Sequence, residues 1–316
     1  MRKLGMMAAT VLAAGMLAPT LGQAIIYGEP DCGAGGCSHP NVVMLGGMLS
    51  GTTGDYYVCS GTLIQKAADY YLFLTAGHCT EHWARRISEG MYSSVGVSFD
   101  AEIDSVVLPD GSPYMDQSHF VSGGVPVTHP DFAPDYHAWN LMWDYGIVSV
   151  PRAAVDAKWP QAATLPMTKL AFEVGLRLED LVAATVQPQK NLLFYAVGYG
   201  MTELLDKGSN AGGPNAWLSG IGTRRIADQE TFTNLRTTLV QTSQNWVHGN
   251  NGTCGGDSGG PLFYRTGSGP VEVGVTSSGD AMCRSTQTSS RMDVETAAWF
   301  VTCARANPGN VKNCGF

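Results

Sequence analysis

Near its C-terminal end the chain reads Gly252-Thr253-Cys254-Gly255-Gly256-Asp257-Ser258-Gly259-Gly260-Pro261. This segment places Ser258 in a glycine-rich turn. Glycines on both sides let the backbone fold tightly, expose the hydroxyl and aim successive N–H groups at a developing oxyanion, where residues with a Cβ atom would crowd. A serine in such a turn is typical of a nucleophile with its oxyanion hole. We therefore interpret the chain as a serine hydrolase.

A serine nucleophile needs a general base and a carboxylate that orients the base. His78 follows an apolar run that we expect to be a strand entering a turn, in Leu74-Thr75-Ala76-Gly77-His78-Cys79. Asp144 stands at the head of another apolar run, in Trp143-Asp144-Tyr145-Gly146-Ile147-Val148. Its rivals Asp131 and Asp135 lie in a proline-broken loop with no strand directly after it. The sequence therefore offers His78, Asp144 and Ser258, in that order.

These motifs resemble those of the chymotrypsin-like (trypsin-like) serine proteases. Further segments carry the same resemblance: Cys59-Ser60-Gly61-Thr62-Leu63-Ile64, Ala196-Val197-Gly198-Tyr199-Gly200, Gly274-Val275-Thr276-Ser277-Ser278-Gly279 and Trp299-Phe300. The resemblance implies an all-β fold of two packed six-stranded antiparallel β-barrels of chymotrypsin type, with a short C-terminal helix. It implies one protease domain over residues 25–316, with the boundary between the barrels near residues 151–170.

Chain order separates this reading from an α/β-hydrolase, because Gly256-Asp257-Ser258-Gly259-Gly260 also fits the Gly-x-Ser-x-Gly elbow of those enzymes. Their triad runs serine, acid, histidine, and no histidine follows Ser258. An α/β-hydrolase would therefore lack its base.

The composition agrees with an all-β domain. The 316 residues include 39 glycines, and short Val, Ile, Thr and Tyr runs alternate with turn residues. Helical periodicity is confined to the leader and to the segment after Asp293. A net charge of −8 argues against a nucleic-acid surface and gives no support for binding an anionic membrane. We expect a monomer that acts on protein or peptide substrates, with no cofactor and no metal.

The first 24 residues read as a secretory signal peptide. They combine the positive Met1-Arg2-Lys3, an apolar stretch from Met6 to Leu17 and the small-residue site Gly22-Gln23-Ala24. We expect a secreted protein, either extracellular or periplasmic.

The residues after that site, Ile25-Ile26-Tyr27-Gly28, resemble the mature N-terminus of the family. In that family the new α-amino group pairs with the aspartate before the catalytic serine, which here implies an ion pair between Ile25 and Asp257. Cleavage after Ala24 would create this end directly, with no separate zymogen step. The alternative is a chance match of a short motif.

Eight cysteines in an exported chain predict a disulfide framework, and the residues alone leave 105 connectivities open. The resemblance implies that Cys59–Cys79 staples the histidine turn and that Cys254–Cys283 braces the specificity pocket. Cys32–Cys37 and Cys303–Cys314 are then the remaining pairs.

The resemblance also implies the role of each site residue. Ser258 attacks the scissile carbonyl, His78 acts as general base and then general acid, and Asp144 fixes the histidine tautomer. The peptide N–H groups of Gly256 and Ser258 form the oxyanion hole, and Ser277 bonds Asp144.

The specificity pocket is expected at Gly252, Thr253, Ser277 and Gly279. Gly252 leaves the pocket base without a carboxylate, so cleavage after Lys or Arg is disfavoured, because a cation there would be desolvated without a counter-charge. Gly279 predicts an open wall and therefore a sizeable apolar or aromatic side chain.

The sequence thus predicts an exported serine endopeptidase that works through an acyl-enzyme and has an uncharged specificity pocket. Two alternatives stay open, because fold does not guarantee function. One is a catalytically silent binding protein on the same fold, and the other is a hydrolase that prefers esters.

Overall fold

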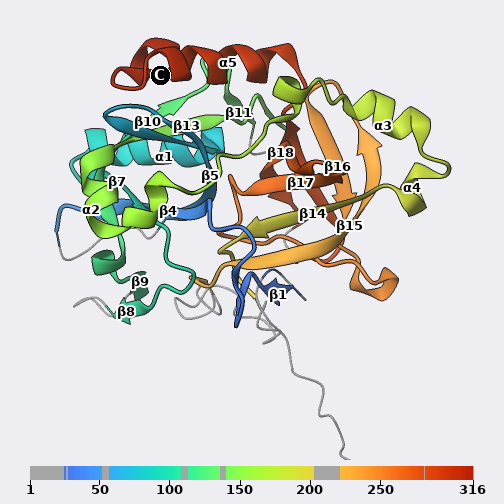
Figure 1. Cartoon of the computed structure of the whole chain (residues 1–316), viewed down its shortest axis with the longest axis horizontal. Helices are drawn as coiled ribbons and strands as arrows, with labels where there is room; N and C mark the ends of the chain where they lie inside the picture. Colours follow the sequence, from blue (N-terminus) through green and yellow to red (C-terminus); the bar gives the residue numbers. More distant parts are fainter. Residues whose placement is uncertain are drawn as a thin grey trace, which may run out of the picture.

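Two β-barrels lie side by side in the computed structural model, with short helices around them (Figure 1). The structure describes residues 25, 28–51, 57–107, 113–135, 140–202, 221–280 and 282–315. The signal peptide expected over residues 1–24 lies outside the described residues, as do Ile26 and Tyr27.

The first barrel is a closed antiparallel ring of six strands in the order β10-β13-β6-β5-β4-β7. Its strands are β4 (Val42–Leu49), β5 (Val58–Lys66), β6 (Tyr70–Thr75), β7 (Tyr92–Ser98), β10 (Val121–Thr128) and β13 (Gly146–Pro151). Residues of these strands fill the interior, and Leu45, Phe73 and Val148 are fully buried. The apolar runs recognised in the sequence therefore form this core.

The second barrel joins β15-β14-β17-β18-β19-β16, and pairing of β15 with β16 closes the ring. Its strands are β14 (Leu193–Gly198), β15 (Arg225–Leu235), β16 (Leu239–Ser243), β17 (Pro261–Thr266), β18 (Gly269–Gly279) and β19 (Thr286–Arg291). The short β1 (Glu29–Pro30) adds to the edge of β15. The predicted fold of two six-stranded antiparallel barrels is therefore confirmed.

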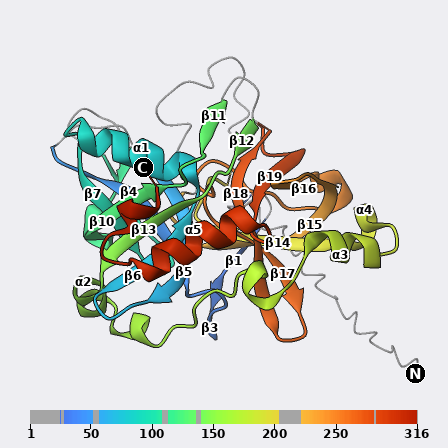
Figure 2. The ribbon, with the colours of Figure 1, turned by 90° about the horizontal axis from the view of Figure 1, so that it is seen from above.

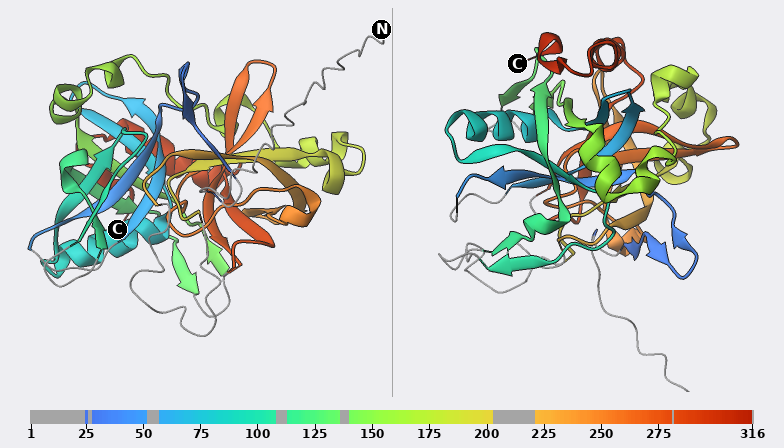
Figure 3. Two further views of the ribbon diagram at one scale, coloured as in Figure 1. Left: turned by 90° about the horizontal axis from the view of Figure 1, so that it is seen from below. Right: turned by 60° about the vertical axis from the view of Figure 1, so that its left-hand side comes forward.

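Three small hairpins stand outside the barrels: β2 (Cys32–Gly33) with β3 (Gly36–Cys37), β8 (Ser105–Val107) with β9 (Pro113–Met115), and β11 (Ala133–Asp135) with β12 (Asn140–Met142). Figures 2 and 3 show the β11–β12 hairpin standing out where the two barrels meet. This hairpin belongs to the long segment before Asp144, and in Figure 2 it lies between α1 (Gly77–Ser88) and β19.

Short helices lie in the connections between the strands. The segment between β13 and β14 contains α2 (Arg152–Lys158), α3 (Leu178–Ala184) and α4 (Pro188–Asn191). Single 3-10 turns occur at Gln117–His119, Pro160–Ala163, Ala171–Val174, Trp246–His248 and Val311–Cys314. In the described part of the chain, no helix has the length and apolar character to cross a membrane.

The C-terminal helix α5 (Glu295–Ala306) follows the second barrel and runs across to the first (Figure 1). At its end the Arg305 guanidinium donates to the carbonyl of Ile64, 2.9 Å away, and the Gln65 amide donates to the carbonyl of Arg305 at 3.2 Å. The helix therefore connects the second barrel to the first through these hydrogen bonds.

A buried polar contact also joins the barrels directly. Thr62 on β5 donates its hydroxyl to Glu272 Oε2 on β18 at 2.8 Å, and both residues are fully buried. Glu272 Oε1 has no hydrogen-bond partner among the residues that the structure describes. Burial raises the pKa of the Glu272 carboxyl to about 8, against a smaller lowering effect of the Thr62 hydrogen bond.

This raised pKa predicts a loss of stability as the pH rises. Between about pH 4.5 and pH 8 the unfolded chain releases the Glu272 proton while the folded chain keeps it, so the free energy of unfolding falls through that window. Glu272→Gln removes the titration. We expect its stability relative to the parent protein to rise by about 5 kcal/mol between pH 4.5 and pH 9, measured by denaturant unfolding.

The matched control is Glu29→Gln, because Glu29 is an exposed glutamate on β1. Its stability relative to the parent should change little over the same range. A flat difference for Glu272→Gln would contradict the burial argument.

Candidate active site

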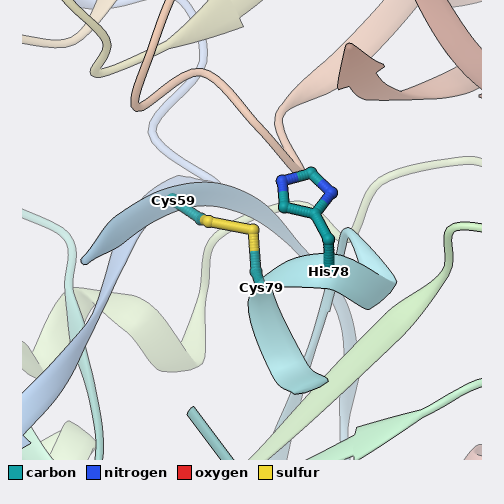
Figure 4. Close-up of side chains that lie close together, drawn as sticks. All are labelled: Cys59, His78 and Cys79. Carbon is teal, nitrogen blue, oxygen red and sulfur yellow. A yellow bond between two sulfur atoms is a disulfide. The ribbon is translucent and has the colours of Figure 1, made fainter. Parts of the chain in front are cut away.

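His78 is the second residue of α1 and directly follows the turn at the end of β6. The Cys59–Cys79 disulfide ties this first helical turn to β5. Figure 4 shows the imidazole rising from the helix beside the disulfide. A Cβ atom on Gly77 would lie 3.0 Å from the Tyr145 carbonyl oxygen and 3.1 Å from Asp144 Oδ1, so a larger residue would fit only if these neighbours shifted. The local fold therefore presses His78 against the Asp144 turn.

Asp144 holds His78 by two hydrogen bonds. His78 Nδ1 lies 2.7 Å from Asp144 Oδ2, and the His78 peptide N–H donates to Oδ1 at 2.7 Å. The hydroxyl of Ser277, on β18, donates to Oδ2 at 2.5 Å. Asp144 is fully buried, so these donors replace the water it has lost.

The hydrogen bond to Asp144 places the imidazole proton on Nδ1. His78 Nε2 has no partner among the described residues and is thus left as a proton acceptor. His78 is only 7% exposed, so it is largely shielded from solvent. This is the arrangement that a general base requires.

Ser258 lies in a turn that packs on the end of β6. The Ser60 peptide N–H donates to the Ser258 carbonyl at 2.8 Å. A Cβ atom on Gly259 would lie 2.0 Å from Thr75 Oγ1 and 2.7 Å from the peptide nitrogen of Ala76, which only glycine permits. The serine turn of the second barrel therefore meets the histidine turn of the first. No hydrogen bond joins Ser258 Oγ to His78 in the described structure.

The serine turn contains the two peptide N–H groups expected to form the oxyanion hole. Its neighbouring N–H groups are bonded, from Asp257 to the Cys254 carbonyl at 3.0 Å and from Gly259 to the Thr276 carbonyl at 2.7 Å. The N–H groups of Gly256 and Ser258 have no acceptor among the residues that the structure describes. Gly256 adopts a φ of +97°, which glycine allows. Two free donors on one turn can bind a developing oxyanion.

Asp257 carries a carboxylate that is buried in the second barrel. It accepts hydrogen bonds from the peptide N–H of Gly200 at 2.7 Å and of Cys254 at 2.9 Å. No cation pairs with it within the described residues. Burial raises its pKa to about 7. Ile25, the expected partner, is fully buried with a φ of +48°, and its distance from Asp257 is not defined by any described contact.

Three of the four residues expected to form the specificity pocket lie against a side chain that the sequence analysis did not single out. Gln244 lies against both Gly252 and Gly279, and the Thr253 hydroxyl lies 3.4 Å from Gln244 Oε1. Ser277 instead bonds Asp144, as described above. The wall at Gly279 is therefore not open space.

A second missed residue is Glu230, on β15. It is fully buried and accepts a 2.7 Å hydrogen bond from the Thr242 hydroxyl. Burial, with a smaller contribution from the Asp257 charge, raises its pKa to about 8 against the lowering effect of the Thr242 hydrogen bond. Neither Gln244 nor Glu230 belongs to a recognisable motif, because strand pairing in the second barrel determines where each side chain lies.

All eight cysteines form disulfides: Cys32–Cys37, Cys59–Cys79, Cys254–Cys283 and Cys303–Cys314. Cys59, His78 and Cys79 lie close enough together to resemble a metal site, and so do Asp31, Cys32 and Cys37. In both clusters the sulfurs are bonded to each other and are not the thiolates that metals bind. These clusters are therefore structural bridges.

Comparison with known protein families matches residues 170–299 to the Trypsin family model. This span includes the serine turn and most of the second barrel, whereas His78 and Asp144 precede it. No curated protein matches the chain.

Proposed function

Since the chain belongs to the chymotrypsin-like (trypsin-like) serine protease family, we propose that it is an exported endopeptidase with His78, Asp144 and Ser258 as its triad. The observation that carries this proposal is the buried Asp144 carboxylate, which binds His78 twice and leaves Nε2 free beside the serine turn. The proposed substrates are proteins or peptides.

The proposed reaction begins when Ser258 Oγ attacks the scissile carbonyl carbon and transfers its proton to His78 Nε2. The carbonyl oxygen becomes an oxyanion that the N–H groups of Gly256 and Ser258 stabilise. Collapse breaks the C–N bond, and His78 protonates the leaving amine. Water then attacks the acyl-enzyme, His78 takes its proton, and the acid product leaves as Ser258 regains its hydrogen.

The surrounding groups lower the energy of both charges that form. Asp144 lies 2.7 Å from Nδ1 and stabilises the imidazolium, while Ser277 keeps the carboxylate in place. The oxyanion meets N–H groups that are already fixed by the turn, so no reorganisation is needed during the reaction. In comparable sites the loss of one such donor costs about 3 to 4 kcal/mol.

The two alternatives have less support. A silent binding protein would not need a buried aspartate that orients a histidine beside a serine turn with free N–H groups. An ester-preferring hydrolase would use the same acyl-enzyme chemistry, and amide substrates distinguish it from an endopeptidase.

A fluorophosphonate probe tests the nucleophile. We expect stoichiometric labelling of the mature protein at Ser258, found by peptide mapping, and none in Ser258→Ala.

Asp144→Asn should lower kcat for a peptide amide roughly 10⁴-fold, because the carboxylate that fixes the histidine tautomer is lost. Ser268→Ala, in an exposed turn between β17 and β18, is the control and should react like the parent.

Proteolysis that survives Ser258→Ala cannot come from this site. A folded mature protein that takes no label and hydrolyses no amide would contradict the proposal in favour of the binding protein. Turnover of esters without turnover of amides would favour the esterase.

The proposed maturation step is cleavage after Ala24, which would free the Ile25 amino group to pair with Asp257. A buried carboxylate with no cation among the described residues supports this step. The backbone of Ile25 supports it too, because a positive φ is strained for a β-branched residue. Removal of the preceding carbonyl by cleavage relieves that strain.

This step predicts that a chain beginning at Ile25 and one that keeps Ala24 differ in their free energy of unfolding, and that this difference follows a bell-shaped curve with pH. In the longer chain, Asp257 destabilises the fold progressively from about pH 4 to pH 7, because only the folded form keeps the proton. The ion pair removes that penalty and is lost again when the amino group deprotonates. The difference in free energy of unfolding should peak near pH 7.5 at about 3 kcal/mol.

Asp257→Asn should abolish the difference between the two chains, since the amide cannot form the ion pair. N-terminal sequencing of the secreted protein should begin at Ile25. A different first residue, or a difference in stability that ignores pH, would contradict the step.

A further inference from the structure

Gln244 directly follows β16 and is 1% exposed. Its backbone N–H donates to the Ser285 carbonyl at 2.9 Å, so the residue is fixed where β16 ends beside β19. The side chain then runs into the second barrel toward the serine turn. No step of the proposed mechanism uses it.

The side chain of Gln244 spans the gap between two glycines of the expected pocket. A Cβ atom on Gly252 would lie 2.4 Å from Gln244 Oε1 and 2.6 Å from Gln244 Cβ. A Cβ atom on Gly279 would lie 3.2 Å from Gln244 Nε2. The space that these glycines leave empty is therefore filled by Gln244.

Both ends of the Gln244 amide have partners. Nε2 donates to the Thr286 carbonyl at 3.2 Å, and the Thr253 hydroxyl lies 3.4 Å from Oε1. Rotation of the side chain out of the pocket would break both contacts, while the Thr286 carbonyl would keep the Asp280 N–H at 3.0 Å and the Thr253 hydroxyl would keep Gln287 at 2.8 Å.

Behind Thr253 the polar network continues to the barrel interior. The Gln287 amide lies 2.8 Å from the Thr253 hydroxyl and is fully buried. With its nitrogen toward Glu230, this amide donates to both carboxylate oxygens at 2.8 Å and accepts from Thr276 and Ser289. Gln287 and Thr253 thus lie between the Glu230 carboxyl and the expected pocket.

We propose that Gln244 determines specificity by filling the deeper part of the pocket, so that the enzyme cleaves after short uncharged side chains such as Ala or Ser. This inference rests on the proposed endopeptidase function. An aromatic or long aliphatic side chain would have to displace Gln244. A Lys or Arg side chain would meet an amide instead of a counter-charge.

This inference revises the expectation of a sizeable apolar side chain that Gly279 suggested. A glycine wall creates room only if no other residue occupies the space beside it. Here the occupant comes from the end of β16, eight residues before Gly252.

The test compares peptide amides that differ only in the residue before the scissile bond: Ala, Phe or Lys. The chain beginning at Ile25 should show kcat/KM for Ala at least about 10-fold above that for Phe or Lys, the range that pocket fit produces. Gln244→Ala should raise the Phe-to-Ala ratio of kcat/KM by about 10-fold or more. Gln241→Ala is the matched control, since Gln241 lies on β16 and bonds Thr288 outside the pocket; its ratio should equal the parent's.

The inference is overturned if the parent cleaves after Phe or Lys as fast as after Ala, or if Gln244→Ala leaves the ratio unchanged. If Gln244→Ala does not fold, Gln244→Asn shortens the plug while keeping its amide, and it should raise the ratio in the same direction. Fluorophosphonate labelling of the same samples distinguishes failure of this inference from failure of the proposed function. A parent that is labelled at Ser258 but has the wrong preference overturns this inference alone, whereas a folded parent with neither labelling nor cleavage overturns the proposed function with it.

Discussion

The hydrogen bonds to the buried Asp144 carboxylate are the contacts on which the site depends. Asp144 belongs to the first barrel, binds the first turn of α1 through His78, and accepts the Ser277 hydroxyl from the second barrel. A buried carboxylate is stable only if such donors replace water. The charge therefore fixes the histidine and also specifies how the two barrels meet.

The surface between the barrels is more polar than a simple hydrophobic core. Besides Asp144, it contains the Thr62–Glu272 hydrogen bond and a 2.6 Å hydrogen bond from the Tyr145 hydroxyl to the carbonyl of Arg291. Directional contacts of this kind fix the relative position of two barrels, whereas apolar contact alone tolerates sliding. A site whose members come from both barrels needs that precision.

The sequence predicted the two barrels and identified the residues around Asp144. Those residues lie in short turns whose backbone conformation restricts which residues can occur there. Gly77 and Gly259 let neighbouring segments approach the backbone more closely than a Cβ atom would, so their motifs can be recognised from the local sequence. The helices in the segment between the barrels and helix α1 were not predicted. They are short, and tertiary packing decides them more than periodicity does.

Gln244 and Glu230 were missed for a different reason. Their positions depend on which strands pair in the second barrel, and a glutamine or glutamate in a polar run is ordinarily read as exposed. Glycines at 252 and 279 signal small side chains but not the space beside them. The motif thus predicts where a pocket would lie, whereas the proposed limit on its depth comes from Gln244, which follows another strand.

The Glu230 carboxyl interacts electrostatically with Asp257, the residue of the proposed maturation step. Glu230 and Asp257 are both fully buried, and the negative charge of Asp257 disfavours ionisation of Glu230. An amino group placed beside Asp257 would cancel much of that repulsion, so it would act on the hydrogen-bond chain from Glu230 through Gln287 to Thr253 as well. Thr253 is the contact between this chain and Gln244. The proposed cleavage would therefore stabilise both the serine turn, through the ion pair of Asp257, and the hydrogen bonds from Glu230 through Gln287 to Thr253, which contacts Gln244.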